Sequence, residues 1–352
     1  MRFSHWLSGF SRKQSLSRRF TRRKRHGDLR PAVERLEDRT LLSTFTVNST
    51  ADTVDASPGD GVAADASGDT TLRAAIMEAN SLPGDDTIDL PAGTYTLSIA
   101  GTGEQAAATG DLDVTASDDG LTIIGAGSTV SVISAGDSSR VFQILGGASL
   151  RLESLQITGG NQPSLSGDSY GGGIRNNIDG TLEIENSLIT DNEASGGGGI
   201  YNQGTATITN SILSDNSTPL AGGAIDNTGL LTVESSLFFG NLGANSAAIR
   251  NTSGSLTLRN STLTDNSATN TGGAIGNDNF GTPAELIVIN STIFGNTANN
   301  ATRIGGIVNN SATVTIRNSI VAGNTGDADI TGAFVSDGNN LIGNVGSASG
   351  LT

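Results

Sequence analysis

The chain aligns with itself over residues 174–324, and asparagine holds the same positions in each copy. The first two columns recur at intervals of 24 to 30 residues. The first column contains Asn186, Asn210, Asn260, Asn290 and Asn318, the second contains Asn192, Asn216, Asn241, Asn266, Asn296 and Asn324, and the third ends an Ile-x-Asn pattern at Asn176, Asn202, Asn227, Asn251, Asn277 and Asn309. In the first column Ser235 is the single substitute. A period of this length is typical of a solenoid, in which each repeat packs only on its neighbours.

Each repeat contains apolar residues at every second position, as in a strand with one buried face. These pairs are Leu182 and Ile184, Ala206 and Ile208, Leu231 and Val233, Leu256 and Leu258, Leu286 and Val288, and Val314 and Ile316. A second apolar position follows the first Asn column by three residues, and the Ile of the Ile-x-Asn pattern supplies a third. Three short inward-facing strands per repeat, without helical periodicity, predict a right-handed parallel β-helix.

Asparagine suits the corners of such a coil for two physical reasons. Successive coils stack about 4.8 Å apart, so each column lies directly above its counterpart, and an amide carries both a donor and an acceptor. Asparagine also tolerates the left-handed backbone conformation that a corner requires. We therefore interpret the three columns as structural ladders and not as sugar or ion sites.

The composition agrees with an all-β chain. Glycine accounts for 48 of 352 residues while aromatic residues are only 4%, which argues against a helical globular enzyme. The chain has no cysteine, so disulfides and thiolate metal sites are excluded.

Charge divides the sequence into two parts near residue 40. Residues 1–40 contain twelve Lys or Arg and four acidic residues, whereas the remainder has eight Arg, no Lys and thirty-one acidic residues. We expect residues 1–43 to be a disordered basic leader. The acidic body would repel phosphates, so we expect no nucleic-acid partner, and no apolar run is long enough to predict an integral membrane segment.

The segment "VERLEDRTLLS" (33–43) at the end of the leader resembles the LEPR-XLL segment of large bacterial extracellular proteins. The matching residues are Leu36, Glu37, Arg39, Leu41 and Leu42, while Asp38 replaces the motif's proline. This resemblance implies export or sorting to the cell surface.

Residues 70–97 begin with an amphipathic run that predicts a short capping helix over 71–80. The stretch resembles the CSLREA domain of bacterial right-handed β-helix proteins. The matching residues are Leu72, Arg73, Ala75, Ile76, Ala79, Asn80, Gly84, Asp86, Thr87, Ile88 and "PAGTYTL" (91–97), with departures at Thr70 and Ala74. The repeats "GGAI" (222–225 and 272–275), "FFGN" (238–241) and "IFGN" (293–296) resemble the motifs of polymorphic outer membrane proteins.

These resemblances and the repeats predict one β-helix over residues 44–352. We divide it into a cap with the first strands at 44–100, early coils at 101–180 and regular coils at 181–352. The resemblances imply a secreted or surface-exposed bacterial protein of a class whose members mostly have no assigned activity.

Two groups of aspartates are candidates for catalysis or metal binding. The adjacent pairs Asp85-Asp86 and Asp118-Asp119 could serve glycoside hydrolysis, but each lies beside glycine, as turn residues do. Residues 55–69 form a glycine-rich acidic loop that could bind Ca²⁺ through Asp55, Asp60, Asp65 and Asp69. Their spacing matches no known calcium motif, so an ordinary acidic loop is the simpler interpretation.

The sequence thus favours a non-catalytic secreted or surface protein with a role in adhesion or envelope structure. Its expected partners are carbohydrate or envelope components, and it requires no cofactor unless the acidic loop binds Ca²⁺. The alternative is a polysaccharide lyase or hydrolase with a site along one outward face. We assign no catalytic residue, because the body has no His or Lys and its Arg residues are scattered.

Overall fold

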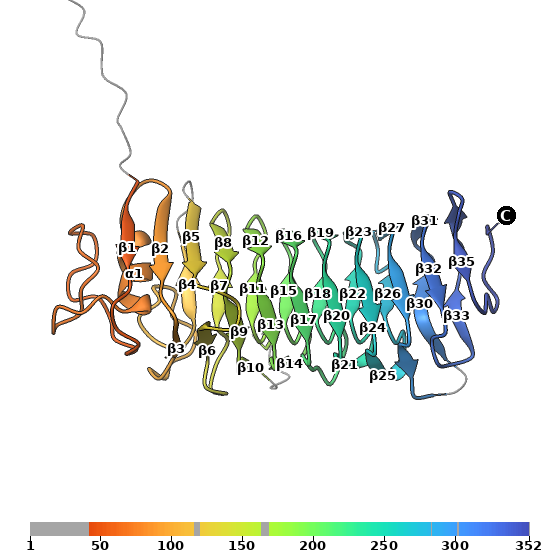
Figure 1. The fold of residues 1–352 in the computed structure, drawn as a ribbon, viewed down its shortest axis with the longest axis horizontal. Coiled ribbons are helices and arrows are strands. Elements are labelled where there is room, and N and C mark those ends of the chain that lie inside the picture. The colour runs from red at the N-terminus through yellow and green to blue at the C-terminus, as the bar shows by residue number, and fades with distance from the viewer. Residues whose placement is uncertain (1–41, 116–119, 163–168, 283, 301–302, 352) are drawn as a thin grey trace, which may run out of the picture. The chain divides into compact units, whose positions relative to one another are not determined.

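Each sequence repeat forms three short strands, and strands of the same kind stack in parallel from coil to coil (Figure 1). The computed structural model describes residues 42–115, 120–162, 169–282, 284–300 and 303–351. The chain runs through three long sheets in turn, which we name A, B and C, and then returns to sheet A one coil further on. Because crossovers between parallel strands are right-handed, this path is a right-handed parallel β-helix. The predicted fold class is confirmed.

Sheet A contains the strands that carry the alternating apolar pairs. Its strands in the described residues are β1 (Thr44–Thr46), β2 (Asp86–Leu90), β5 (Gly120–Gly125), β8 (Ser149–Glu153), β12 (Thr181–Glu185), β16 (Thr205–Thr209), β19 (Leu230–Glu234), β23 (Ser255–Arg259), β27 (Glu285–Ile289), β31 (Thr313–Arg317) and β34 (Val335–Ser336).

Sheet B follows each strand of sheet A after a corner. In the described residues it consists of β3 (Gly93–Thr96), β6 (Ser131–Ser134), β9 (Gln156–Thr158), β13 (Leu188–Thr190), β17 (Ile212–Ser214), β20 (Leu237–Phe239), β24 (Thr262–Thr264), β28 (Thr292–Phe294), β32 (Ile320–Ala322) and β35 (Leu341–Ile342).

Sheet C contains the Ile-x-Asn strands. In the described residues these are β4 (Leu112–Val114), β7 (Phe142–Ile144), β11 (Ile174–Asn176), β15 (Ile200–Asn202), β18 (Ile225–Asn227), β22 (Ile249–Thr252), β26 (Ile275–Asp278), β30 (Ile304–Asn310) and β33 (Ala328–Thr331). Between sheets B and C lie shorter strands, which pair as β10 (Asn161–Gln162) with β14 (Glu193–Ala194), and as β21 (Leu242–Asn245), β25 (Ser267–Thr271) and β29 (Thr297–Ala298).

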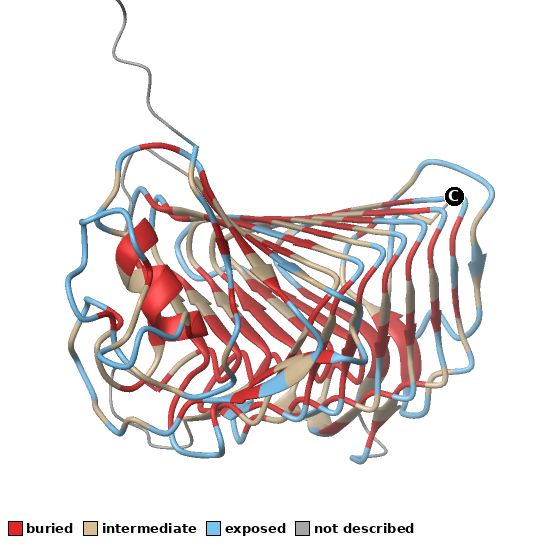
Figure 2. Cartoon of the chain, turned by 60° about the vertical axis from the view of Figure 1, so that its left-hand side comes forward, coloured by how far each residue is buried: buried red, intermediate tan, exposed pale blue. Residues whose placement is uncertain are grey.

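The interior of the coil is filled by the repeated apolar columns (Figure 2). In sheet A, for example, Leu182 pairs in register with Leu150 and Ala206, and all three are buried. Stacking like residues in this way packs each coil on the next along the whole length of the helix.

Two asparagine columns form hydrogen-bonded ladders inside the coil. In the second column, Asn192 donates through Nδ2 to Asn216 Oδ1 at 3.0 Å, and the same bond continues through Asn241, Asn266, Asn296 and Asn324. The third column repeats this from Asn176 to Asn309, starting with Asn176 Nδ2 to Asn202 Oδ1 at 2.7 Å. Each amide also donates to a backbone carbonyl, so its burial leaves few polar groups unpaired.

The first asparagine column differs from the expected internal ladder. Its members lie exposed at the corner between sheets A and B with φ near +50°, as does Ser235, so their left-handed conformation explains the residue type. Two hydrogen bonds join side-chain amides of this column: Asn290 Nδ2 donates to Asn260 Oδ1, and Asn318 Nδ2 donates to Asn290 Oδ1. The buried ladder at this corner is formed instead by the serine that follows each member of the column. Ser187 N donates to Ser211 Oγ, and the same hydrogen bond repeats from coil to coil as far as Ser319.

The helix α1 (Leu72–Ala79) lies at the N-terminal end of the coils, where its residues are largely buried (Figures 1 and 2). It begins at Thr71, whose Oγ1 accepts a hydrogen bond from Ala74 N, and packs against β2 and β4. It thereby covers the apolar end of the first coils, as the sequence predicted. No helix in the described ranges is long and apolar enough to cross a membrane.

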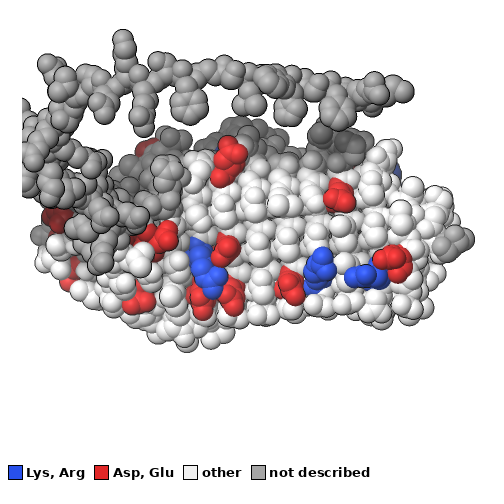
Figure 3. Space-filling view, turned by 90° about the horizontal axis from the view of Figure 1, so that it is seen from above, with Lys and Arg blue, Asp and Glu red and all other residues white. Residues whose placement is uncertain are grey.

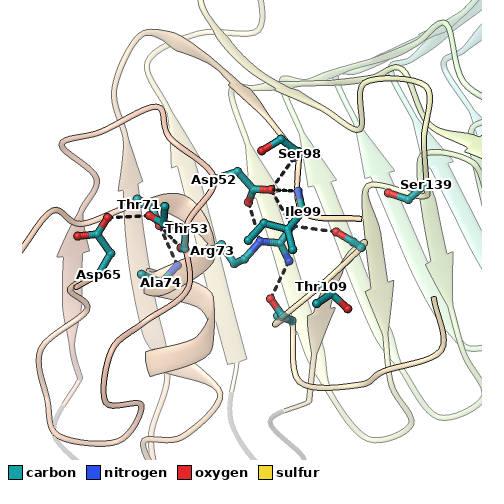
Figure 4. Close-up of polar contacts among 12 residues, drawn as sticks. Asp52, Thr53, Asp65, Thr71, Arg73, Ala74, Ser98, Ile99, Thr109 and Ser139 are labelled. Carbon is teal, nitrogen blue, oxygen red and sulfur yellow. Dashed lines mark hydrogen bonds and ion pairs between the residues drawn. The ribbon is translucent and has the colours of Figure 1, made fainter. Parts of the chain in front are cut away.

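Arg73 on α1 joins this cap to the coils through a buried ion pair (Figure 4). Its guanidinium contacts the Asp52 carboxylate at 2.6 Å and donates to the carbonyls of Ala107 and Gly110. Asp52 in turn accepts hydrogen bonds from the backbone N–H groups of Ser98 and Ile99. All the charges in this network are therefore compensated within the protein.

We expect Asn241→Ala to lower the free energy of unfolding by about 3 kcal/mol, because Asn216 would lose the acceptor of two buried donors. Asn299→Ala, the same change at an exposed position, serves as the control. The two variants are compared by urea denaturation followed by circular dichroism. Equal midpoints for both variants would contradict a stabilising role for the ladder.

Arg73→Met should destabilise the protein by about 3 to 5 kcal/mol, because it leaves the Asp52 carboxylate buried without its partner. The double variant Asp52→Asn/Arg73→Met removes both charges and should recover part of this loss. Thermal unfolding midpoints measure both. A double variant no more stable than the single one would show that the ion pair is not the cause.

Candidate functional site

The outward side chains of sheet C form one continuous column along the helix. Since Ile225 and Asn227 point inward, Asp226 between them points outward. In register from the N-terminal end, this sheet C column contains Asp113, Gln143, Arg175, Tyr201, Asp226, Arg250, Gly276 and Val308. Because adjacent coils lie about 4.8 Å apart, each member neighbours the next.

Loops between sheets B and C shield much of this column from solvent. Asp113 is fully buried, and Asp226 is only 4% exposed although it faces outward. A Cβ at Gly196, in the loop before β15, would lie 3.2 Å from Asp226 Oδ2, which shows how closely that loop covers the carboxyl group. The column thus places charged groups in a partly desolvated setting.

The shield opens beside Arg250 into a cavity of about 400 Å³, which we call the Arg250 cavity. Its walls are the sheet C strands β22, β26 and β30 on one side and the segments around Leu220 and Asn245 on the other. Gly276 lies on the floor, where a Cβ would come within 2.1 Å of Ser246 Oγ. This size is within the range of small-molecule sites.

The Arg250 side chain is held in this cavity without donating a hydrogen bond to any described residue. Its Nη1 lies 3.8 Å from Asp226 Oδ2, and its Nε lies 3.5 Å from Asp278 Oδ2. Its Cζ lies 5.6 Å from the centre of the Phe280 ring. The guanidinium is therefore positioned by charge and by the ring, while its donors remain available.

Arg140 and Arg151, by contrast, donate hydrogen bonds through their guanidinium groups. Arg140 donates to the Gly171 carbonyl at 2.9 Å and to Asp111 at 2.8 Å. Arg151 on sheet A contacts Glu153, Glu183 and Glu185, which hold its pKa above the ordinary value. Charged side chains are sparse on the face shown in Figure 3, and the basic groups there stand beside acidic ones.

Asp226 lies next to Arg250 on the preceding coil and is buried beside the cavity. Burial raises its pKa to about 7, Arg250 opposes this rise and Asp278 adds to it. Its Oδ1 has no hydrogen-bond partner in the described residues. The carboxyl group can therefore exchange a proton near neutral pH.

Asp113 at the other end of the column has a similar environment. Burial raises its pKa to about 7, with further increases from Asp111 and Glu104 and a small opposing effect of Arg140. Between these two acids, the Tyr201 ring lies 4.8 Å from the Tyr170 ring, centre to centre. Burial also raises the pKa of Tyr201.

In the predicted calcium loop, the carboxylates of Asp55, Asp60 and Asp65 accept hydrogen bonds within turns, and Asp69 contributes its backbone N–H to Asp65. Asp55 accepts from Ser57 N, Asp60 accepts from Val62 N, and Asp65 accepts from the N–H groups of Ser67 and Asp69. Burial raises the pKa of Asp55, whereas hydrogen bonds lower that of Asp65. In the described part of the chain, no three Asp, Glu, His or Cys side chains are grouped to hold a metal ion.

The acidic pair Asp85-Asp86 also has structural contacts. Asp85 Oδ1 accepts from Gly120 N at 2.7 Å, and Asp86 Oδ1 accepts from Ser43 N at 3.0 Å. The two side chains of this pair thus tie neighbouring segments together. Asp118 and Asp119 lie outside the described residues, as does the leader with its LEPR-XLL-like residues except Leu42.

Sequence reasoning did not identify Asp226, Arg250, Asp278 or Phe280 as a site. The signal was present in the middle position of the Ile-x-Asn pattern, which reads Arg, Tyr, Asp, Arg, Gly and Val in successive repeats. A position that varies between two repeated ones points outward and is free of the packing constraint. The loop that covers it could not be inferred from that pattern.

No family model and no curated protein matches the chain. Among solved structures, a crystal structure of the pectate lyase Pel9A aligns with a TM-score of 0.48 and 16% sequence identity. The alignment covers 87% of this chain and 78% of that one. This likeness says nothing about the activity of the present chain.

We expect the stability of the protein to fall as the pH rises from about 4 to about 7. The pKa of Asp226 is about 7 in the folded protein and 3.8 in the unfolded chain. Between these pH values the folded state therefore keeps a proton that the unfolded state has lost. Asp226→Asn should make this dependence shallower and raise the melting temperature at pH 8, while Asp113, whose pKa is also raised to about 7, keeps its own contribution. Thermal unfolding at a series of pH values measures it.

The control is Asp179→Asn, which removes one charge at an exposed turn position where asparagine tolerates the positive φ. It should leave the slope unchanged. If Asp226→Asn and the control gave the same pH profile as the parent protein, Asp226 would not be the titrating group.

Proposed function

We propose that this protein is a secreted or cell-surface β-helix that binds glycan chains without cleaving them, in adhesion or in envelope structure. The observation that carries the proposal is the sheet C column with its open Arg250 cavity. The cavity presents charged, aromatic and amide groups from successive coils, namely those of Arg250, Asp278, Phe280 and Asn310. Such a linear array suits an extended ligand better than a compact one.

The geometry of the cavity favours binding over catalysis. A general acid must come within hydrogen-bond reach of the bond that breaks. Asp226 is 4% exposed and lies under Arg250, so a ligand in the cavity meets the guanidinium before the acid. The other carboxylate, Asp278, accepts from Asn310 Nδ2 at 2.7 Å through Oδ1.

The resemblances in the sequence support the cellular setting of the proposal. The LEPR-XLL-like segment at 33–43 implies export, and the CSLREA-like cap and the GGAI and FxxN-like repeats are typical of secreted β-helix proteins. An exported β-helix with a row of outward polar groups fits contact with carbohydrate or other envelope components.

A polysaccharide-active enzyme is the second candidate, because Asp226 and Asp278 flank Arg250 in different environments. The pKa of Asp226 is raised to about 7, while Asp278 is the partly exposed member of the pair. Two carboxyl groups whose environments differ in this way are a pattern found in acid–base catalysis.

We expect the full-length protein to co-sediment with insoluble polysaccharide while releasing no product. The panel contains cellulose, xylan and insoluble pectate, with and without Ca²⁺. Binding is read from the pellet, and reducing ends and unsaturated products are assayed in the supernatant. Binding without product is the expected result, because the buried acid does not reach the ligand.

The Asp226→Asn variant separates the two candidates. It should bind as the parent protein does, since Asp226 does not line the cavity. Product formation by the parent protein that this variant abolishes would establish the enzyme instead. The absence of binding to every member of the panel would contradict a glycan-binding role.

A further inference from the structure

We propose that the Arg250 cavity binds a neutral pyranose through its hydroxyl groups, with one face of the sugar against Phe280. This inference rests on the proposed glycan-binding function and specifies its site and ligand class. It follows from the donors and acceptors left open in the cavity, from its local charge and from its exposed aromatic ring.

The cavity places a free donor and a free acceptor side by side. The Arg250 guanidinium has no hydrogen-bond acceptor within the described residues, and Asp278 Oδ2 has only the Arg250 contact at 3.5 Å. A hydroxyl group both donates and accepts, so neighbouring hydroxyls of one sugar can pair with both side chains. The 3.5 Å separation is a loose contact that a ligand can replace with shorter hydrogen bonds.

The charges in the cavity disfavour ionic ligands. Arg250 and Asp278 both line the cavity, so an acidic sugar would meet the Asp278 carboxylate as well as the guanidinium, with the Asp226 carboxyl group buried behind them. The body of the chain adds a large negative charge, since it has thirty-one acidic residues against eight Arg. A cationic sugar would meet Arg250 directly. A neutral polyhydroxyl ligand avoids both costs.

Phe280 provides the apolar surface that a sugar ring needs. It lies in the turn after β26 and is 67% exposed, so it is not part of the core. Its backbone N–H donates to Ser253 Oγ, which fixes the turn on the neighbouring coil. Leu220, 42% exposed on the opposite segment, adds a second apolar contact within the cavity. Ligand sites commonly combine such apolar walls with a few polar groups.

The test is isothermal titration calorimetry of the full-length protein with three tetrasaccharides: cellotetraose as the neutral probe, tetragalacturonate as the acidic one and chitosan tetramer as the cationic one. Two variants remove the proposed contacts. Phe280→Ala removes the ring, and Asp278→Asn removes the charged acceptor while keeping an oxygen for Asn310. The matched controls are Phe294→Ala, an exposed ring on sheet B, and Asp179→Asn.

We expect cellotetraose to bind. Each cavity variant should raise the Kd for cellotetraose by about tenfold, while the controls leave it unchanged. Preferred binding of the acidic or cationic tetramer would overturn the ligand class. Binding of cellotetraose that neither cavity variant weakens would overturn the location and leave the proposed function standing. No binding to any tetramer, together with no binding to the insoluble panel, would overturn both.

Discussion

Hydrogen bonds between the amides of successive coils are the constraint on which the other features of this fold depend. An asparagine inside the coil has two donors and an acceptor to satisfy. The Asn216 amide donates to Asn241 Oδ1 and to the Ile189 carbonyl, and its oxygen accepts from Asn192 Nδ2. A shift of one residue in a sheet C strand would turn its asparagine to the outer face and leave buried amide groups of the neighbouring coils unpaired, at a cost of about 1 to 3 kcal/mol each. The ladders therefore hold the coils from Asn176 to Asn324 in the same register, and the outward residues of these coils are aligned as a consequence.

Most of the fold could be predicted from the sequence, because the same residue types recur at the positions that pair between coils. The spacing of Leu182 and Ile184, and of Ile225 and Asn227, was sufficient to predict the strands of sheets A and C and the direction of their side chains. The corner at Asn186 was only half predicted. Its conformation followed from the residue type, but the buried ladder is formed by Ser187 and its counterparts. A serine beside each asparagine was visible in the alignment, yet nothing in its pattern distinguished a buried hydroxyl from an exposed one.

The candidate site was not predictable in the same way, since it depends on contacts between segments that do not repeat. The middle residue of each Ile-x-Asn triplet is released from the core and can vary, which identifies the column but not its environment. The desolvation that raises the pKa of Asp226 comes from the segments between sheets B and C, and these differ in length and composition from coil to coil. The opening at Gly276 likewise depends on the position of Ser246 in such a segment.

Arg73 and Arg250 differ in whether their guanidinium donors are paired within the protein. Arg73 has its donors occupied by Asp52 and two carbonyls, and it serves to fasten the cap to the coils. Arg250 lies in the sheet C stack, and its nearest carboxylates are at 3.5 and 3.8 Å. Because the ladders below already secure the register, this position does not have to contribute to folding. A guanidinium can then be kept with its donors unpaired, and a ligand that pairs them gains hydrogen bonds that the free protein lacks.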